Sequence, residues 1–145
     1  MDIYSIDKRK EIMAKVHSRN TKPEVFVRKF LFNKGFRYKL HVNKLPGSPD
    51  IVLPRYKTAV FVHGCFWHGH KGCSFANLPK SNTDFWRKKQ ITNQLRDFQK
   101  EQQLLALGWF VETIWECELR NSITSYIRLT NLINSLTLRE GIKID

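Results

Sequence analysis

Three cysteines and one histidine constrain the fold of this chain more than any other feature of its sequence. Cys65, His70 and Cys73 lie within nine positions, and Cys117 follows far along the chain. Thiolates together with an imidazole select zinc, and four such ligands complete a tetrahedron. The pattern therefore predicts a structural zinc ion that ties a loop to a distant strand and has no open position for chemistry. The alternative is three buried free cysteines and a surface histidine.

Length and charge narrow the class of protein. The chain has 145 residues, enough to bury a core as a single domain over residues 1–145 without disulfides. Its net charge is +12, from 25 Lys and Arg against 13 Asp and Glu. Such a charge favours a nucleic acid as partner, because each cation placed on a phosphate releases counterions. The alternative is simply a well-charged, soluble surface.

Patterns typical of membrane and secreted proteins are missing from the sequence. No stretch approaches the ~20 apolar residues that a membrane span needs, and the first residues lack the apolar core of a signal peptide. The cysteine count is odd, which disfavours a disulfide framework in a chain of this length. We therefore expect no membrane partner and a reducing, cytoplasmic location.

The N-terminal part of the chain predicts a helix preceded by a basic segment. Residues 1–20 are polar and basic, and they indicate either a short helix or an arm that closes on a partner. Thr21, Pro23 and Glu24 match a helix start, with a capping threonine, a proline in the first turn and a glutamate three positions after the cap. Gly35 matches the end of that helix.

The rest of the chain predicts a mixed sheet covered by helices. We expect three strands, over residues 36–42, 51–53 and 58–62, and then a long helix that is capped by Ser81 or Thr83 and ends at about 107. A fourth strand over residues 109–115 and a last helix from about 122 should follow. The second and third strands should form a hairpin. The residues that the long helix should bury are Ile91, Leu95, Phe98 and Leu105. Those that the last helix should bury are Ile123, Tyr126, Ile127, Ile133 and Leu136. This order of elements predicts an α/β fold.

Asp50 and His68 are the first candidates for chemistry. Asp50 opens an apolar strand after a Ser-Pro turn, where an aspartate is unfavourable unless it has a specific task. One such task is an Asx-turn, and the other is to bind Mg²⁺ through a carboxylate oxygen. His68 lies between two of the zinc ligands, and the usual pKa of histidine suits general acid–base catalysis. On a basic chain, this combination predicts a nuclease.

Two further carboxylates have plain structural explanations. Glu24 is the glutamate of a capping box, and Asp97 lies beside Arg96 in the long helix, where it can be a solvated charge. Phe66 and Trp67 stand inside the cysteine loop. They either pack into the core or stack on bases, because aromatic wedges can enter a base step.

Several longer motifs resemble those of the very short patch repair endonucleases, the Vsr family. The segments that carry the resemblance are NTKPE (20–24), LPGSPDIVLP (45–54), FVHGCFWH (61–68), NTDFW (82–86) and WEC (115–117). The resemblance extends from about residue 8 to 120. It implies a restriction-endonuclease-like fold, with an α/β/α core around a mixed sheet.

The resemblance also implies an activity. Members of the family nick one DNA strand 5′ to the thymine of a T:G mismatch, which arises when 5-methylcytosine deaminates, and so initiate very short patch repair. The implied substrate is double-stranded DNA. We expect the protein to act as a monomer, because a monomer suits an asymmetric mismatch. The implied cofactors are catalytic Mg²⁺, as two ions, and structural Zn²⁺. The implied protein partners are general mismatch-repair proteins and a cognate cytosine-5 methyltransferase.

Residue roles follow from the same resemblance. Asp50 would bind Mg²⁺ together with the main-chain carbonyl of Val62, and His68 would assist proton transfer. Glu24 and Asp97 would support the water molecules of the site. Cys65, His70, Cys73 and Cys117 would hold the zinc. The side chains that would enter the DNA stack beside the mismatch are those of Phe66, Trp67 and Trp86.

Three rival functions remain open on the sequence. A restriction endonuclease of the same fold would cut both strands, and a zinc-stapled DNA-binding module would cut neither. A secreted disulfide protein would have its cysteines oxidised. A cut in a single strand of T:G duplexes, with matched duplexes spared, would separate the proposed repair enzyme from all three.

Overall fold

A four-stranded mixed sheet forms the centre of the protein. The computed structural model describes residues 19–140. Most of the arm predicted over residues 1–20 therefore lies outside the described residues. The strands are β1 (Lys39–Leu40), β2 (Ile51–Leu53), β3 (Thr58–His63) and β4 (Phe110–Trp115). They lie side by side in chain order, with β1, β2 and β3 antiparallel and β4 parallel to β3.

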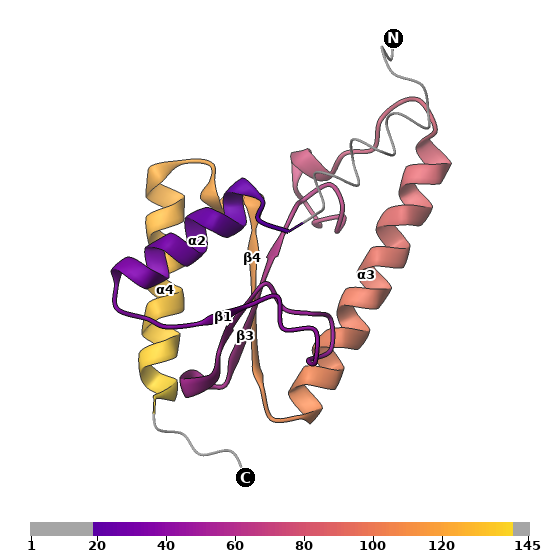
Figure 1. Cartoon of the computed structure of the whole chain (residues 1–145). Helices are drawn as coiled ribbons and strands as arrows, with labels where there is room; N and C mark the ends of the chain where they lie inside the picture. Colours follow the sequence, from indigo (N-terminus) through magenta and orange to yellow (C-terminus); the bar gives the residue numbers. More distant parts are fainter. Residues whose placement is uncertain (1–18, 141–145) are drawn as a thin grey trace.

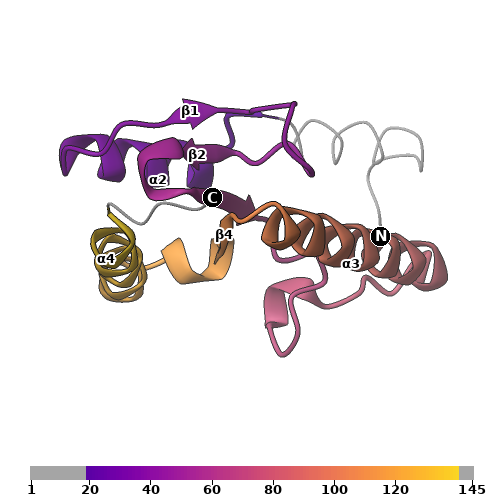
Figure 2. The same cartoon turned by 90° about the horizontal axis from the view of Figure 1, so that it is seen from below.

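Three α-helices in residues 19–140 cover the sheet. They are α2 (Lys22–Asn33), α3 (Thr83–Ala106) and α4 (Ser122–Arg139). Helices α2 and α4 lie on one side of the sheet and α3 on the other (Figures 1 and 2). The main core fills the space between α2, α4 and the sheet, with Leu31, Ile51, Ile114 and Leu132 fully buried. The expected α/β architecture with a mixed sheet is confirmed.

Local signals in the sequence account for the confirmed elements. Helix α2 begins where expected, because the Thr21 Oγ1 accepts a hydrogen bond from the Glu24 N–H at 3.4 Å. The expected hairpin of β2 and β3 is present and is closed by a short 3₁₀ turn, Pro54–Tyr56. Its first strand is buried at every position, as the continuous apolar run predicts.

The strand expected over residues 36–42 is much shorter than predicted. Only Lys39 and Leu40 pair with β2. His41 adopts a positive φ of 50°, which turns the chain out of the strand, although its N–H still donates to the Asp50 carbonyl at 3.2 Å. Both strand residues are exposed, so the expected alternation of buried and exposed side chains is not seen in β1, and the strand ends at this turn.

The buried face expected for α3 is wrong. Ile91, Leu95, Phe98 and Leu105 are between 47% and 61% exposed. Helix α3 instead turns a largely polar face inward, with Trp86, Asn93 and Leu104 buried. The reason is a neighbouring loop, residues 64–73, whose backbone carbonyls need hydrogen-bond donors that apolar side chains cannot supply.

The buried face expected for α4 is also largely wrong. Leu136 is buried and Ile133 is partly buried, as predicted. Ile123, Tyr126 and Ile127 are more than half exposed, and the helix instead buries Ser125, Leu129, Leu132 and Leu136. The sequence of α4 offers two apolar stripes, and the sheet contacts the one that contains the leucines. Within residues 19–140, no helix combines the length and apolar character needed to cross a bilayer.

Candidate active site and metal centre

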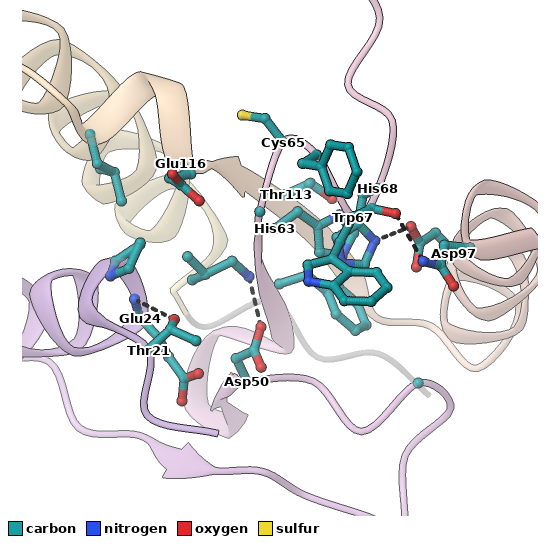
Figure 3. A pocket seen from close by; sticks show the side chains of 18 of the residues that line it. Thr21, Glu24, Asp50, His63, Cys65, Trp67, His68, Asp97, Thr113 and Glu116 are labelled. Atoms are coloured by element: carbon teal, nitrogen blue, oxygen red, sulfur yellow. Dashed lines mark hydrogen bonds and ion pairs between the residues drawn. The ribbon is translucent and has the colours of Figure 1, made fainter. Parts of the chain in front are cut away.

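Asp50 lies immediately before β2, at the point where the sheet loses a strand. The strand β2 pairs with β3 only over residues 58–60, whereas β3 continues along β4 as far as His63. The Asp50 carboxylate takes the place of the missing strand, because its Oδ2 accepts a hydrogen bond from the Val62 N–H at 2.8 Å (Figure 3). Burial, partly offset by this hydrogen bond, raises the pKa of Asp50 to about 6.

His68 and Asp97 form a close pair across the same cavity. The His68 Nδ1 lies 2.5 Å from the Asp97 Oδ2, and the His68 side chain is only 11% exposed (Figure 3). The His68 ring stacks on His63, with centroids 3.7 Å apart and an angle of 4° between the planes. Contact with a carboxylate at Nδ1 orients the imidazole and directs its basic lone pair to Nε2. This arrangement suits proton transfer at a fixed position.

One cavity connects these groups. Its volume is about 1180 Å³, and its walls include Glu24, Asp50, His68 and Asp97. All four carboxylates and imidazoles predicted to act in catalysis therefore face a common space. Basic side chains line it as well, and a phosphate group would neutralise them. They are Arg19, Lys22, Arg96, Lys100 and Arg120.

Glu24 lies close to a histidine that the sequence pattern did not single out. Its Oε1 lies 2.8 Å from the Nε2 of His41, and burial raises the pKa of Glu24. Burial also lowers the pKa of the His41 imidazole. A signal for His41 was available in the sequence, because an antiparallel pairing of residues 39–40 with 51–52 brings His41 opposite Asp50. The strand expected over residues 36–42 included His41, so the turn at His41 that directs its imidazole toward Glu24 was not predicted.

The predicted zinc ligands gather in one cluster. One atom from each of Cys65, His70, Cys73 and Cys117 lies within 4.8 Å of the others. All three cysteines are free, and the Cys117 Sγ lies 3.5 Å from the His70 Nδ1. Burial raises the pKa of Cys65 to about 12, so this thiol needs a nearby cation to become a thiolate at neutral pH. The cluster can hold a metal ion, and its three sulfurs and one imidazole are donors that fit zinc.

Polar side chains of α3 hold the loop between the cysteines. The side-chain amide of Gln90 donates to the Phe66 carbonyl at 2.7 Å, and that of Asn93 donates to the Trp67 carbonyl at 2.9 Å. Gln94 donates to the Gly69 carbonyl at 2.7 Å. Gly69 has a φ of +56°, and a Cβ there would lie 2.4 Å from the Gln94 Nε2. The cluster and the helix thus fix the loop that carries His68 from two sides.

The three predicted intercalating residues form one aromatic cluster. The ring centroids of Phe66 and Trp86 are 5.6 Å apart, and those of Trp67 and Trp86 are 6.2 Å apart. Phe66 and Trp67 are partly exposed and line the cavity. Trp86 is only 3% exposed and lies against them. Of the three side chains, Trp86 is therefore the one that a DNA duplex could reach only after the cluster opens.

Comparison with known proteins identifies the family. A family model described as DNA mismatch endonuclease Vsr matches residues 1–74. The Type II nicking enzyme V.NmeAIP of Neisseria meningitidis serogroup A is 50% identical over 135 residues, which cover 93% of this chain and 96% of that protein. This chain belongs to the Vsr family. The family assignment inferred from the motifs is thus confirmed, and with it the expectation of a DNA endonuclease.

Other Vsr relatives cover most of the chain. The Type II nicking enzyme V.XorIIP of Xanthomonas oryzae pv. oryzae is 46% identical, over 92% of this chain and 97% of that protein. The DNA mismatch endonuclease Vsr of Escherichia coli (strain K12) is 35% identical, over 82% of this chain and 76% of that protein. The similarity to each therefore extends well beyond the residues that the family model matches.

Proposed function

We propose that this Vsr-family protein is a Mg²⁺-dependent endonuclease that nicks one strand of a DNA duplex 5′ to the thymine of a T:G mismatch. Such mismatches arise when 5-methylcytosine deaminates, and the nick would initiate very short patch repair. The observation that carries the proposal is the common cavity, in which Asp50 and the His68–Asp97 pair lie beside the aromatic side chains Phe66 and Trp67. We further propose that the single domain has a restriction-endonuclease-like fold and acts as a monomer.

The surroundings of Asp50 support its role as the Mg²⁺ ligand. A carboxylate oxygen is a donor that Mg²⁺ prefers. The Val62 N–H points to Asp50, and the N–H and C=O of a paired strand residue point to the same side of the strand. The Val62 carbonyl therefore faces the same space and can be the second ligand. When bound there, Mg²⁺ would stabilise the negative charge that develops on the scissile phosphate.

The His68–Asp97 pair supplies the proton chemistry. His68 Nε2 would accept a proton from the attacking water, whose oxygen forms the new bond to phosphorus. The bond from phosphorus to the 3′ oxygen breaks, and that oxygen takes up a proton. Asp97 keeps the imidazole oriented through the 2.5 Å contact and stabilises the imidazolium that forms. The products would be a 5′-phosphate and a 3′-hydroxyl.

Mismatch selectivity would come from the aromatic cluster. Insertion of Phe66 and Trp67 into a base step costs a few kcal/mol of unstacking. A wobble pair stacks and deforms differently from a matched pair, so the cost is lower at the mismatch. The structural zinc would keep the loop in place through Cys65, His70, Cys73 and Cys117, since a structural ion contributes directly to folding. Trp86 would support the wedge and contact DNA once the cluster opens.

A panel of labelled duplexes tests the proposal. Each duplex carries a different label on each strand and a T:G, T:A or C:G pair in varied sequence contexts, with and without Mg²⁺. We expect one nick, in the T strand and 5′ to the mismatched thymine, only with Mg²⁺ and not with Asp50→Asn. Asp84→Asn removes an exposed carboxylate on α3 and serves as the matched control.

The same assay separates the rival functions. Cuts in both strands, or in matched duplexes, would indicate a restriction endonuclease. Binding to every duplex without any cut, unchanged by Asp50→Asn, would indicate a DNA-binding module. Either result would refute the proposed repair activity.

A further inference from the structure

Three polar side chains from separate segments meet beside the proposed Mg²⁺ position. Glu24 comes from the first turn of α2, His41 follows β1, and Asp50 precedes β2. One ligand atom from each lies within 4.8 Å of the other two. Two carboxylates and one imidazole at this separation have the composition of a divalent-cation site.

Two of these atoms are buried without a hydrogen bond. Glu24 is 3% exposed, and neither its Oε1 nor the His41 Nε2 has a hydrogen-bond partner in the structure, although the two atoms lie 2.8 Å apart. A buried polar atom without a partner is destabilising, so such a pair needs an explanation. Two ligands that occupy neighbouring positions around one small cation lie about this far apart, because each is roughly 2.1 Å from the ion.

A nearby arginine does not satisfy the Glu24 oxygen. The Arg28 NH1 is 3.8 Å from the Glu24 Oε1, too far for a hydrogen bond, and it donates instead to the Asn20 Oδ1 at 2.7 Å. The Asp50 Oδ2 is already occupied by the Val62 N–H. The other carboxylate oxygen of Asp50 is thus the one that can join Glu24 and His41.

The backbone at His41 fixes the imidazole in this position. His41 has a φ of +50°, a conformation that costs free energy for any residue other than glycine. The His41 N–H donates to the Asp50 carbonyl at 3.2 Å, which holds the turn directly opposite Asp50. Strained backbone of this kind persists where the surroundings require it, and it is enriched at functional sites.

We propose that Glu24, His41 and Asp50 form a divalent-cation site in which the His41 Nε2 is a direct ligand. The site would share Asp50 with the Mg²⁺ position proposed above, and in this respect it rests on the proposed function. A nitrogen ligand favours transition metals over Mg²⁺, which prefers oxygen. The site would therefore take Mn²⁺ in preference to Mg²⁺, and the two cation positions of the cavity would differ in selectivity.

Mn²⁺ is the suitable probe for the full-length protein without DNA. It is the weakest binder in the transition-metal series, so it should not displace an ion held by the cysteine cluster. Free Mn²⁺ is counted by electron paramagnetic resonance, and a directly bound imidazole is detected by its ¹⁴N coupling in pulsed spectra. The variants are His41→Gln, His68→Gln and, as a control on the exposed strand β1, Lys39→Ala.

We expect wild type, Lys39→Ala and His68→Gln to show the nitrogen coupling and His41→Gln to lack it. His41→Gln should also bind Mn²⁺ about tenfold more weakly or worse, because loss of even an outer-shell partner of a metal site typically costs that much. If His41→Gln does not fold, His68→Gln and a further variant, His63→Gln, decide together, because these are the two histidines that line the cavity. Coupling retained in both supports His41 as the ligand, and coupling lost in either overturns it.

Two other results would overturn the inference. One is nitrogen coupling that persists in His41→Gln, and the other is wild-type protein that binds no Mn²⁺. Neither result would decide the proposed function. That function is tested by the Mg²⁺-dependent nicking of T:G duplexes and by the loss of nicking in Asp50→Asn. The two proposals can therefore fail separately.

Discussion

Asp50→Asn should stabilise the Mg²⁺-free protein while it abolishes nicking. Asn keeps an oxygen that can accept a hydrogen bond from the Val62 N–H, but it removes a carboxylate whose pKa is raised by burial from its usual value of 3.8 to about 6. The folded protein therefore binds this proton more tightly than the unfolded chain does. The contribution to stability is fully present below pH 4 and is lost as the pH rises through 6.

The size of the effect follows from the pKa difference. The pKa of Asp50 differs by about 2 between the folded and unfolded states. Each pKa unit corresponds to roughly 1.4 kcal/mol, so the upper limit of the effect is about 3 kcal/mol. At pH 8 the carboxylate is charged in both states, so the substitution should raise the free energy of unfolding by up to about 3 kcal/mol. At pH 4.5 most of the folded protein is already protonated at Asp50, and the gain should fall to about 1 kcal/mol.

Urea denaturation at the two pH values measures this difference. The buffer contains no Mg²⁺ and no chelator, so that an ion held by the cysteine cluster stays in place. Asp84→Asn is the control, because its carboxylate is 89% exposed and its removal should change the free energy of unfolding equally at both pH values. Added Mg²⁺ should stabilise wild type at pH 8 but not Asp50→Asn, since a ligand of the folded state shifts the equilibrium by mass action.

An equal effect of Asp50→Asn at both pH values would refute the argument. So would a variant less stable than wild type at pH 8. Either result would mean that Asp50 is well solvated in the folded protein or that its carboxylate is needed for folding. In both cases the cavity would not hold the desolvated carboxylate on which the proposed Mg²⁺ site depends.

Three further substitutions test the loop and its aromatic side chains. Cys117→Ser should release the bound metal and lower the melting temperature, and an unchanged melting temperature with full metal content would exclude the structural ion. Trp67→Ala should reduce the preference for T:G over matched duplexes more than it reduces general affinity, as competition binding would show, whereas equal losses would indicate only packing. Gly69→Ala should displace the Gln94 amide and lose about 1 kcal/mol more stability in urea than Gly72→Ala, because a Cβ at Gly72 meets nothing within 4 Å. Equal losses for the two glycines would mean that this hydrogen bond contributes little.

Local patterns were enough to locate most elements and the members of the cysteine–histidine cluster. The capping threonine placed the start of α2, continuous apolar runs placed the hairpin, and the donor chemistry of the cysteines and His70 placed their cluster. Each of these depends on residues near one another in sequence or on the chemistry of the side chain itself. For this reason no knowledge of the whole fold was needed.

The inward faces of the helices required the tertiary structure. In α3, the polar side chain of Asn93 faces inward because it donates a hydrogen bond to the Trp67 carbonyl of the neighbouring loop, while Phe98 is 61% exposed. Hydrophobic periodicity cannot reveal this, since the partner is backbone that the chain supplies from another region.

The pairing of His41 with Glu24 was decided in the same way. It depends on a turn with positive φ that ends β1 after two residues and directs the imidazole toward α2. Residue identity supplied the two carboxylates and the imidazole, whereas only packing of α2 against the end of the sheet brought their polar atoms within 4.8 Å of one another. A sequence specifies which atoms can bind an ion, but the distances between them arise from contacts among elements far apart along the chain.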